Sequence, residues 1–136
     1  RAEVARSLVN RPDLLLLDEP FRGLDHMSRG LMQEHFLNLF EEHRTTTLFV
    51  TSEIDEAIFL ADQLVILTYR PTSVKAVIDV SLPRPRKFHI QTSKMYNDLK
   101  SEALEFLYEE ALKGFSKGSA AARDMERIVE EAMSNR

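Results

Sequence analysis

The chain has 136 residues, of which 43% are hydrophobic and 29% are charged, a balance that suits one modest hydrophobic core. It contains no cysteine, which excludes disulfides and thiol nucleophiles, and its four histidines show no ligand spacing, so any metal would need carboxylate ligands. A formal charge of -4 argues against nucleic acid as a partner, because phosphate binding depends on clustered Lys and Arg. No apolar run approaches the roughly 20 residues of a membrane helix and no signal peptide is recognisable, so a cytosolic location is expected.

The chain begins with a predicted helix and a predicted strand. Residues 1–10 carry apolar side chains at helical spacing but start without an N-cap or an initiator methionine, which is typical of a truncated sequence. Pro12 then predicts a break in the helix. Residues 14–18 form an uninterrupted apolar run that ends in a carboxylate, and this run predicts a strand buried on both faces.

The following elements have the order of a parallel sheet. Residues 26–44 predict a helix that covers one face of the sheet, residues 45–51 predict a second buried strand, and residues 53–61 predict a short helix. The apolar stripe of the first of these helices consists of Met27, Leu31, Met32, Phe36, Leu39 and Phe40. An order of strand, helix, strand and helix is typical of parallel sheets. Residues 64–69 and 74–80 predict an antiparallel hairpin at the margin of that sheet.

The last third of the chain predicts a helical tail. Residues 82–87 hold two prolines in a basic stretch, which favours an extended linker over a packed element. Residues 93–115 then predict a helix with one apolar side, and residues 119–133 predict a second helix after Gly114 and Gly118. We expect the tail to dock onto the first part of the chain. The predicted fold class is therefore α/β, a parallel sheet with flanking helices followed by a helical tail.

The candidate site lies where the first predicted strand ends. Asp18 and Glu19 follow the apolar run directly, and ligands bind at the carboxyl ends of strands in open α/β sheets. A carboxylate such as Asp18 can hold Mg²⁺, usually through water. A solvated acidic turn is the alternative explanation of this pair. Asp25 precedes the next predicted helix, where Asp is also a common N-cap.

Four motifs, in the right order, resemble those of ATP-binding cassette (ABC) ATPases. Residues 1–8 (RAEVARSL) are similar to the helix that follows the signature loop of that family, and residues 14–20 (LLLLDEP) to its Walker B strand. Gly23-Leu24-Asp25 falls where the family carries its D-loop. Residues 50–57 (VTSEIDEA) fall where it carries its switch-histidine loop. Residues 55–62 and the Arg70-Pro71 turn resemble the nitrate, sulfonate and taurine importer branch.

This resemblance implies a fold, a set of ligands and a role for each site residue. Residues 1–86 would be the C-terminal part of a P-loop NTPase (RecA-like) nucleotide-binding domain, and residues 87–136 a helical C-terminal tail. The cofactors would be ATP and Mg²⁺, with Asp18 binding the ion and Glu19 orienting or deprotonating the attacking water. Asp25 would meet the nucleotide-binding interface of the opposite subunit in a head-to-tail dimer.

The resemblance also implies partners and a location. The partners would be a second ATPase subunit, transmembrane permease subunits and, indirectly, a substrate-binding protein. The subunit would lie on the cytoplasmic, inner face of the cell membrane. Its implied function is ATP hydrolysis that powers uptake of a small solute such as nitrate, sulfonate or taurine.

Two departures from the family pattern matter. The glycine-rich phosphate loop, the glutamine loop and the signature loop are absent from these 136 residues, so the segment alone is expected to be inactive. Ser52 stands where the family normally has histidine, and a serine hydroxyl brings no charge to the γ-phosphate. A bridging water compensates, hydrolysis is slow, or unequal subunits divide the work. Ser52 also favours an alternative function, a non-catalytic, degenerate ATPase-like subunit with a regulatory or scaffolding role.

Overall fold

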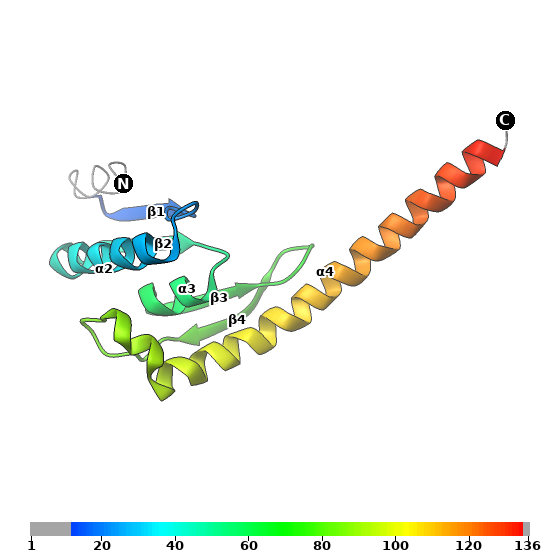
Figure 1. Cartoon of the computed structure of the whole chain (residues 1–136). Coiled ribbons are helices and arrows are strands. Elements are labelled where there is room, and N and C mark those ends of the chain that lie inside the picture. The colour runs from blue at the N-terminus through cyan, green and yellow to red at the C-terminus, as the bar shows by residue number, and fades with distance from the viewer. Residues whose placement is uncertain (1–11, 135–136) are drawn as a thin grey trace.

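The computed structural model describes residues 12–134, and describes side chains up to residue 118. The helix predicted over residues 1–10 lies outside the described residues. The elements in chain order are β1 (Leu14–Asp18), α2 (His26–His43), β2 (Thr46–Val50), α3 (Ile54–Leu60), β3 (Gln63–Leu67), β4 (Val74–Asp79), the 3-10 helix η1 (Phe88–Thr92) and α4 (Lys94–Ser134) (Figure 1). The predicted strands and the helices α2 and α3 are confirmed to within two residues at each end.

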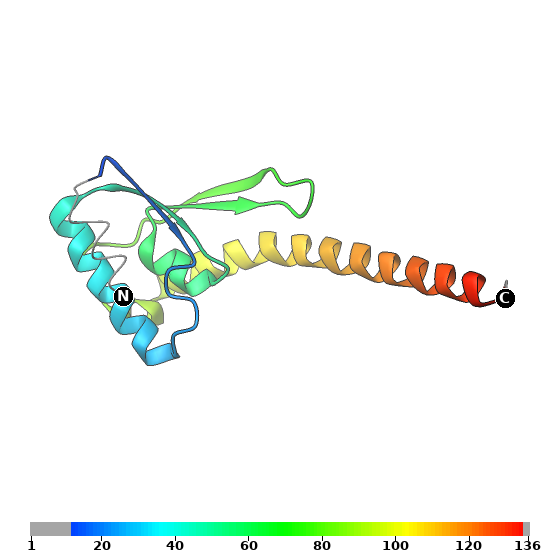
Figure 2. The ribbon, with the colours of Figure 1, turned by 90° about the horizontal axis from the view of Figure 1, so that it is seen from above.

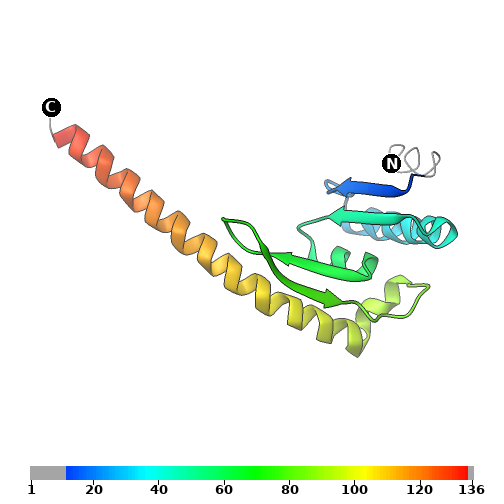
Figure 3. The same ribbon diagram turned by 180° about the vertical axis from the view of Figure 1, so that it is seen from behind.

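The strands form two separate pairs. β1 and β2 run parallel, with Leu14 opposite Thr46 and Asp18 opposite Val50, which confirms the predicted parallel order. β3 and β4 form the predicted antiparallel hairpin. Among the described residues this hairpin is not hydrogen-bonded to β1 or β2, so its predicted place at the margin of the same sheet is wrong. β2 and β3 are joined only through α3, and no described strand bridges them (Figure 3).

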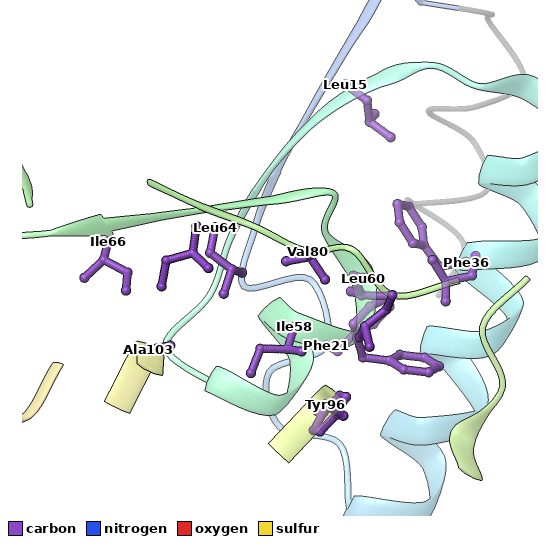
Figure 4. Close-up of a cluster of buried hydrophobic side chains, with 14 residues drawn as sticks. Leu15, Phe21, Phe36, Ile58, Leu60, Leu64, Ile66, Val80, Tyr96 and Ala103 are labelled. Atoms are coloured by element: carbon purple, nitrogen blue, oxygen red, sulfur yellow. The ribbon is translucent and has the colours of Figure 1, made fainter. Parts of the chain in front are cut away.

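The parallel pair is covered on one face only in the described part of the chain. Leu15 is 6% exposed and belongs to the core with Phe36 of α2, whereas Leu14 and Leu16 are 53% and 64% exposed. Side chains alternate between the two faces of a strand, and α2 covers the face to which Leu15 points (Figure 4). The prediction that β1 is buried on both faces is therefore wrong for this chain.

Helix α2 turns only part of its predicted apolar stripe inward: Phe36 is buried, and Met32 and Leu39 pack against the core. Its buried residues are Gly30, Gln33, Phe36 and Leu37. Met27 and Leu31, by contrast, belong to the exposed side of the helix. Gly30 is covered by the ring of Phe88, and a Cβ at this position would be 2.8 Å from the Phe88 Cε2 atom. Gln33 also donates a buried hydrogen bond to α3.

Helix α3 lies at the centre of the hydrophobic core. Ile58 and Phe59 of this helix are fully buried, and Figure 4 shows side chains from the strands, α2 and α4 gathered around it. Three aromatic rings, those of Phe21, Phe36 and Phe49, pack beside α3 with centroids 5.8, 6.0 and 6.3 Å apart. Such aromatic contacts add to the apolar area that the core buries.

The segment of residues 82–87 is packed, so the prediction of an extended linker is wrong. Arg86 is 3% exposed, and its guanidinium donates to the carbonyl oxygens of Ile58, Phe59 and Ala61 at 3.4, 3.1 and 2.7 Å. These carbonyls belong to the C-terminal end of α3. The carbonyl groups of a last helical turn have no N–H donor within the helix, so they need partners from elsewhere. Burial lowers the pKa of Arg86 to about 10, which leaves it charged near neutral pH. A domain boundary near residue 86 stays a prediction.

The tail is one helix rather than the predicted two. α4 runs unbroken from Lys94 to Ser134 and projects away from the other elements (Figure 2). Gly114 and Gly118 are helical, and Gly23 is the described glycine with positive φ, at 82°. A Cβ on Gly114 would lie 3.1 Å from the ring of Tyr69, so this glycine permits close packing instead of ending the helix. Among the described residues, no helix combines the length and the apolar character needed to cross a membrane.

The first part of α4 docks onto α3 and the hairpin, as predicted. Tyr96 and Ala103 are 1% and 0% exposed. Further along, the Glu110 carboxylate accepts hydrogen bonds from Lys113 at 2.6 Å and from Lys75 of β4 at 2.7 Å. These hydrogen bonds, with a third from the hairpin backbone, lower the pKa of Glu110 to about 2.

Candidate functional site

The parallel strands bring two predicted site residues together at one edge. The backbone N–H of Glu19 donates to the carbonyl oxygen of Val50 at 2.9 Å, which continues the pairing of β1 and β2. The Oε1 atom of Glu19 then accepts a hydrogen bond from the backbone N–H of Ser52, also at 2.9 Å. Glu19 and Ser52, which are 33 positions apart in the chain, are therefore in direct contact.

Glu19 adopts a backbone conformation that residues other than glycine rarely take. Its φ is +45°, in the left-handed region, where such a residue is strained by an energy of order 1 kcal/mol. The turn that follows is held by hydrogen bonds from Arg22 N to Glu19 O at 3.1 Å and from Leu24 N to Phe21 O at 3.3 Å. Phe21 is 2% exposed and anchors the turn in the aromatic part of the core. The hydrogen bonds and the buried Phe21 thus fix the conformation of the turn, and this conformation keeps the Glu19 side chain directed at the Ser52 loop.

Asp18 lies at the same edge but is not part of this contact. It is the exposed last residue of β1. Mg²⁺ in nucleotide sites usually keeps several waters and takes one or two protein carboxylates, a donor set that an exposed Asp18 fits. Over residues 12–118, no group of three or more His, Asp or Glu side chains is placed to hold a metal ion by itself. Asp18 as a magnesium ligand stays a prediction.

Asp25 acts as the N-cap of α2. Its Oδ1 atom accepts a hydrogen bond from the backbone N–H of Ser28 at 3.0 Å. Hydrogen bonding to Ser28 lowers the pKa of the Asp25 carboxyl, because it favours the charged form. The capping interpretation of Asp25 is confirmed, and its contact with an opposite subunit stays a prediction.

A cavity of about 430 Å³ adjoins the contact between Glu19 and Ser52. Its lining consists of Glu19, Phe21, Arg22, Arg29, Ser52, Glu53 and Glu56. The lining combines cations and carboxylates, as in the ion pair between Arg29 Nη1 and Glu53 Oε1 at 3.4 Å. Glu56 is 3% exposed, and its Oε2 atom accepts a hydrogen bond from Gln33 at 2.8 Å.

The sequence motifs identified only Glu19 and Ser52 among the charged and polar residues of this cavity. Glu53 and Glu56 lie inside the segment that resembles the switch loop, so their positions were signalled although no role was assigned to them. Arg22 lies in the turn between the Walker B-like strand and Asp25. Arg29 carried no signal at all, because a charged residue on a helix is usually solvated.

Comparison with known proteins identifies relatives of the chain, although no model of a protein family matches it. The bicarbonate transport ATP-binding protein CmpD of Synechococcus elongatus is 43% identical over 110 residues, which are 79% of this chain and 40% of the relative. The nitrate import ATP-binding protein NrtD of the same organism is also 43% identical, with the same coverage of both chains. The aliphatic sulfonates import ATP-binding protein SsuB of Bacillus cereus is 41% identical over 77% of this chain and 41% of the relative.

These matches indicate the class of protein. The chain matches part of the ATP-binding subunits of ABC transporters. Within that class it corresponds to part of a subunit of the branch that contains the nitrate, bicarbonate and sulfonate importers, which confirms the predicted branch. The chain spans about 40% of the length of the curated relatives that it matches.

Proposed function

We propose that the chain is the C-terminal part of the ATP-hydrolysing subunit of an importer for a small anion such as nitrate, bicarbonate or a sulfonate. The relatives named above are ATP-binding proteins of such importers. The observation that carries the proposal is the 2.9 Å hydrogen bond from Ser52 N to Glu19 Oε1. It joins the end of the Walker B-like strand to the switch-like loop. In the family that the chain resembles, ATP is hydrolysed between these two segments.

The proposed fold is the C-terminal part of a P-loop NTPase domain in residues 1–86, followed by the helical tail. The exposed face of the parallel pair supports it, since Leu16 and Leu48 on that face are 64% and 56% exposed. Parallel sheets are stable when both faces are covered. The relatives are more than twice as long as the matched segment, and their additional length is sufficient to cover this face.

Each site residue has a proposed role in this function. Asp18 binds the magnesium ion of Mg-ATP, and that ion neutralises charge on the β- and γ-phosphates. Glu19 orients or deprotonates the attacking water: its Oε1 atom is held by the Ser52 loop, which fixes the direction of the carboxylate. Asp25 caps α2 and faces the nucleotide interface with a second ATPase subunit. The remaining proposed partners are the permease and, through it, a substrate-binding protein, with the subunit on the cytoplasmic face of the membrane.

The identity of residue 52 favours a second candidate, a non-catalytic ATPase-like subunit with a regulatory or scaffolding role. Ser52 has no imidazole with which to share charge that develops on the γ-phosphate. Such a subunit would keep the contact of Glu19 with the loop and would lack turnover.

The test is a Glu19→Gln substitution in the full-length subunit assembled with its permease, read as steady-state phosphate release. The glutamine carbonyl can still accept the hydrogen bond from Ser52, so the loop is retained while the base is lost. We expect turnover to fall by about 10² or more, within the range of general-base catalysis, with Mg-ATP binding largely intact. Glu42→Gln, a surface carboxylate 69% exposed at the far end of α2, is the control. Unchanged turnover would contradict the role of Glu19, and no turnover in the unaltered subunit would favour the second candidate.

A further inference from the structure

The loop that carries Ser52 leads directly into α3, and α3 does not cap its own first turn. Glu53 is the N-cap residue, yet its side chain makes no capping hydrogen bond. Within the loop, the backbone N–H of Glu53 is bonded only to the hydroxyl of Thr51, at 3.0 Å. Other elements must therefore hold the start of α3, because uncapped helix ends are easily frayed.

Two residues of α4 bind Asp55, the second residue of α3. The Tyr96 hydroxyl lies 2.9 Å from the carbonyl oxygen of Asp55 and 3.1 Å from its Oδ1 atom, and its single proton is shared between these two acceptors. Lys100 Nζ donates to the other carboxylate oxygen, Oδ2, at 2.8 Å. The carbonyl oxygen and both carboxylate oxygens of Asp55 are thus bound to α4. Asp55 lies three residues from Ser52 in the chain.

The Tyr96 residue is buried, whereas the side chains of Asp55 and Lys100 are partly open to solvent. Tyr96 is 1% exposed, and the Lys100 side chain is 34% exposed. Burial and the neighbouring Asp55 carboxylate raise the pKa of the Tyr96 hydroxyl, so it remains protonated and donates at physiological pH. A hydroxyl on a buried ring has little access to water, so the loss of its protein partner is costly. Tyr96 therefore makes the dominant connection between the tail and the first turn of α3.

We propose that Tyr96 is a positioning residue of the candidate site: through Asp55 it holds the first turn of α3, and thereby keeps the Ser52 N–H against the Glu19 carboxylate. The first part of the tail, which the matches to the relatives include, then controls the geometry of the site. The proposal rests on the proposed function only for its effect on ATP turnover. The position of the loop itself can be measured on the full-length subunit, independently of ATP turnover.

The first measurement is amide hydrogen exchange by NMR on the full-length subunit with Tyr96→Phe, which removes the hydroxyl and keeps the ring. We expect exchange of the Ser52, Glu53 and Asp55 amides to become about tenfold faster, with the amides of β3 and β4 unchanged. Tyr108→Phe is the matched control, because Tyr108 lies on the same helix and is 67% exposed. This control should leave all of these amides at their original rates.

Unchanged exchange at Ser52 and Glu53 in Tyr96→Phe would overturn the proposal. Equal acceleration at every amide would also overturn it, because that result describes a loss of overall stability. If Tyr96→Phe does not fold, two variants of Lys100 provide the test. Lys100→Met, which removes the ion pair with Asp55, should accelerate amide exchange at Ser52. Lys100→Arg, which keeps the ion pair, should leave that exchange at its original rate. Equal rates in these two variants would reject the connection through Asp55.

The second measurement is ATP turnover of the full-length subunit. Tyr96→Phe should lower kcat severalfold while KM changes less than twofold, because the hydroxyl acts on the loop and not on nucleotide binding. An unchanged kcat with faster loop exchange would overturn the catalytic part of the proposal. If the unaltered subunit hydrolyses no ATP, the proposed function fails, and the exchange rates still test the positioning of the loop by Tyr96.

Discussion

Arg86 provides the sharpest test of how the segment after the hairpin is held, because its charge is almost fully enclosed. Its guanidinium makes two hydrogen bonds of good length, to Ala61 O at 2.7 Å and to Phe59 O at 3.1 Å. It makes three longer ones, at 3.4 Å, to the carbonyl oxygens of Ile58, Val80 and Leu82. The carbonyls lie at the end of α3 and on the chain between β4 and η1, so this one side chain joins these two segments.

Arg86→Met keeps the apolar stem and removes the charge and its hydrogen bonds. Hydrogen bonds to charged groups contribute roughly 1.5–3 kcal/mol each, so the two good ones contribute about 3–6 kcal/mol before any cost is subtracted. Burying the guanidinium has a cost, which its lowered pKa reflects, and this cost offsets part of that gain. We therefore expect the free energy of unfolding to fall by about 3 kcal/mol.

The assay for this change is urea unfolding followed by circular dichroism. With a denaturant slope of about 2 kcal/mol per molar urea, a loss of this size lowers the midpoint by about 1.5 M. Lys87→Met is the matched control: it removes the same charge from the next residue, which is exposed, and should change stability by less than about 0.5 kcal/mol. If Arg86→Met and Lys87→Met unfold at the same urea concentration, the cost of burial cancels the hydrogen bonds and the reasoning is refuted.

Two further predictions concern position 52 and the docking of α4. Ser52→His in the full-length subunit should raise ATP turnover about tenfold, or roughly 1.4 kcal/mol of barrier, because an imidazole can share charge that develops on the γ-phosphate. Equal or lower phosphate release would show instead that a water bridge already serves this position and that the ring displaces it. Glu110 has a pKa lowered to about 2, so its carboxylate stabilises the fold fully above about pH 4.5, and this contribution is lost as the pH falls towards 2. Glu110→Gln should therefore lower the urea midpoint at pH 7 and make it less dependent on pH between 4.5 and 2; parallel pH curves for the two forms would contradict this assignment.

Much of the fold could be predicted because it depends on local patterns. The apolar run before Asp18 and the β-branched run before Ser52 predict strands, and two strands separated by one helix predict parallel pairing. Parallel pairing in turn predicts that the ends of the strands meet, which is where Glu19 contacts Ser52. These steps require only the period of the hydrophobic residues and the rule that connects strand order to strand direction.

The other features could not be predicted because they depend on partners distant in the chain. Arg86 is enclosed by carbonyl groups of α3, and its basic, proline-rich surroundings are typical of a linker. Gly114 is typical of a helix end, yet here it makes room for Tyr69 of the hairpin loop. Tyr96 is 41 positions from Asp55, and nothing in the local sequence connects them. For Arg86 and Gly114, tertiary packing decides between two local structures; for Tyr96, it decides the partner of the side chain.

The contact between Glu19 and residue 52 also explains why serine is compatible with this site. Residue 52 makes the contact through its backbone N–H, which every residue except proline possesses. A histidine or a serine at position 52 can therefore make the same backbone hydrogen bond to Glu19. The two residues differ only in the charge and length of the side chain that extends from the loop. Ser52 is exposed, so a larger ring at this position displaces no part of the core. For this reason we expect Ser52→His to change the rate of hydrolysis and to leave the stability of the fold unaltered.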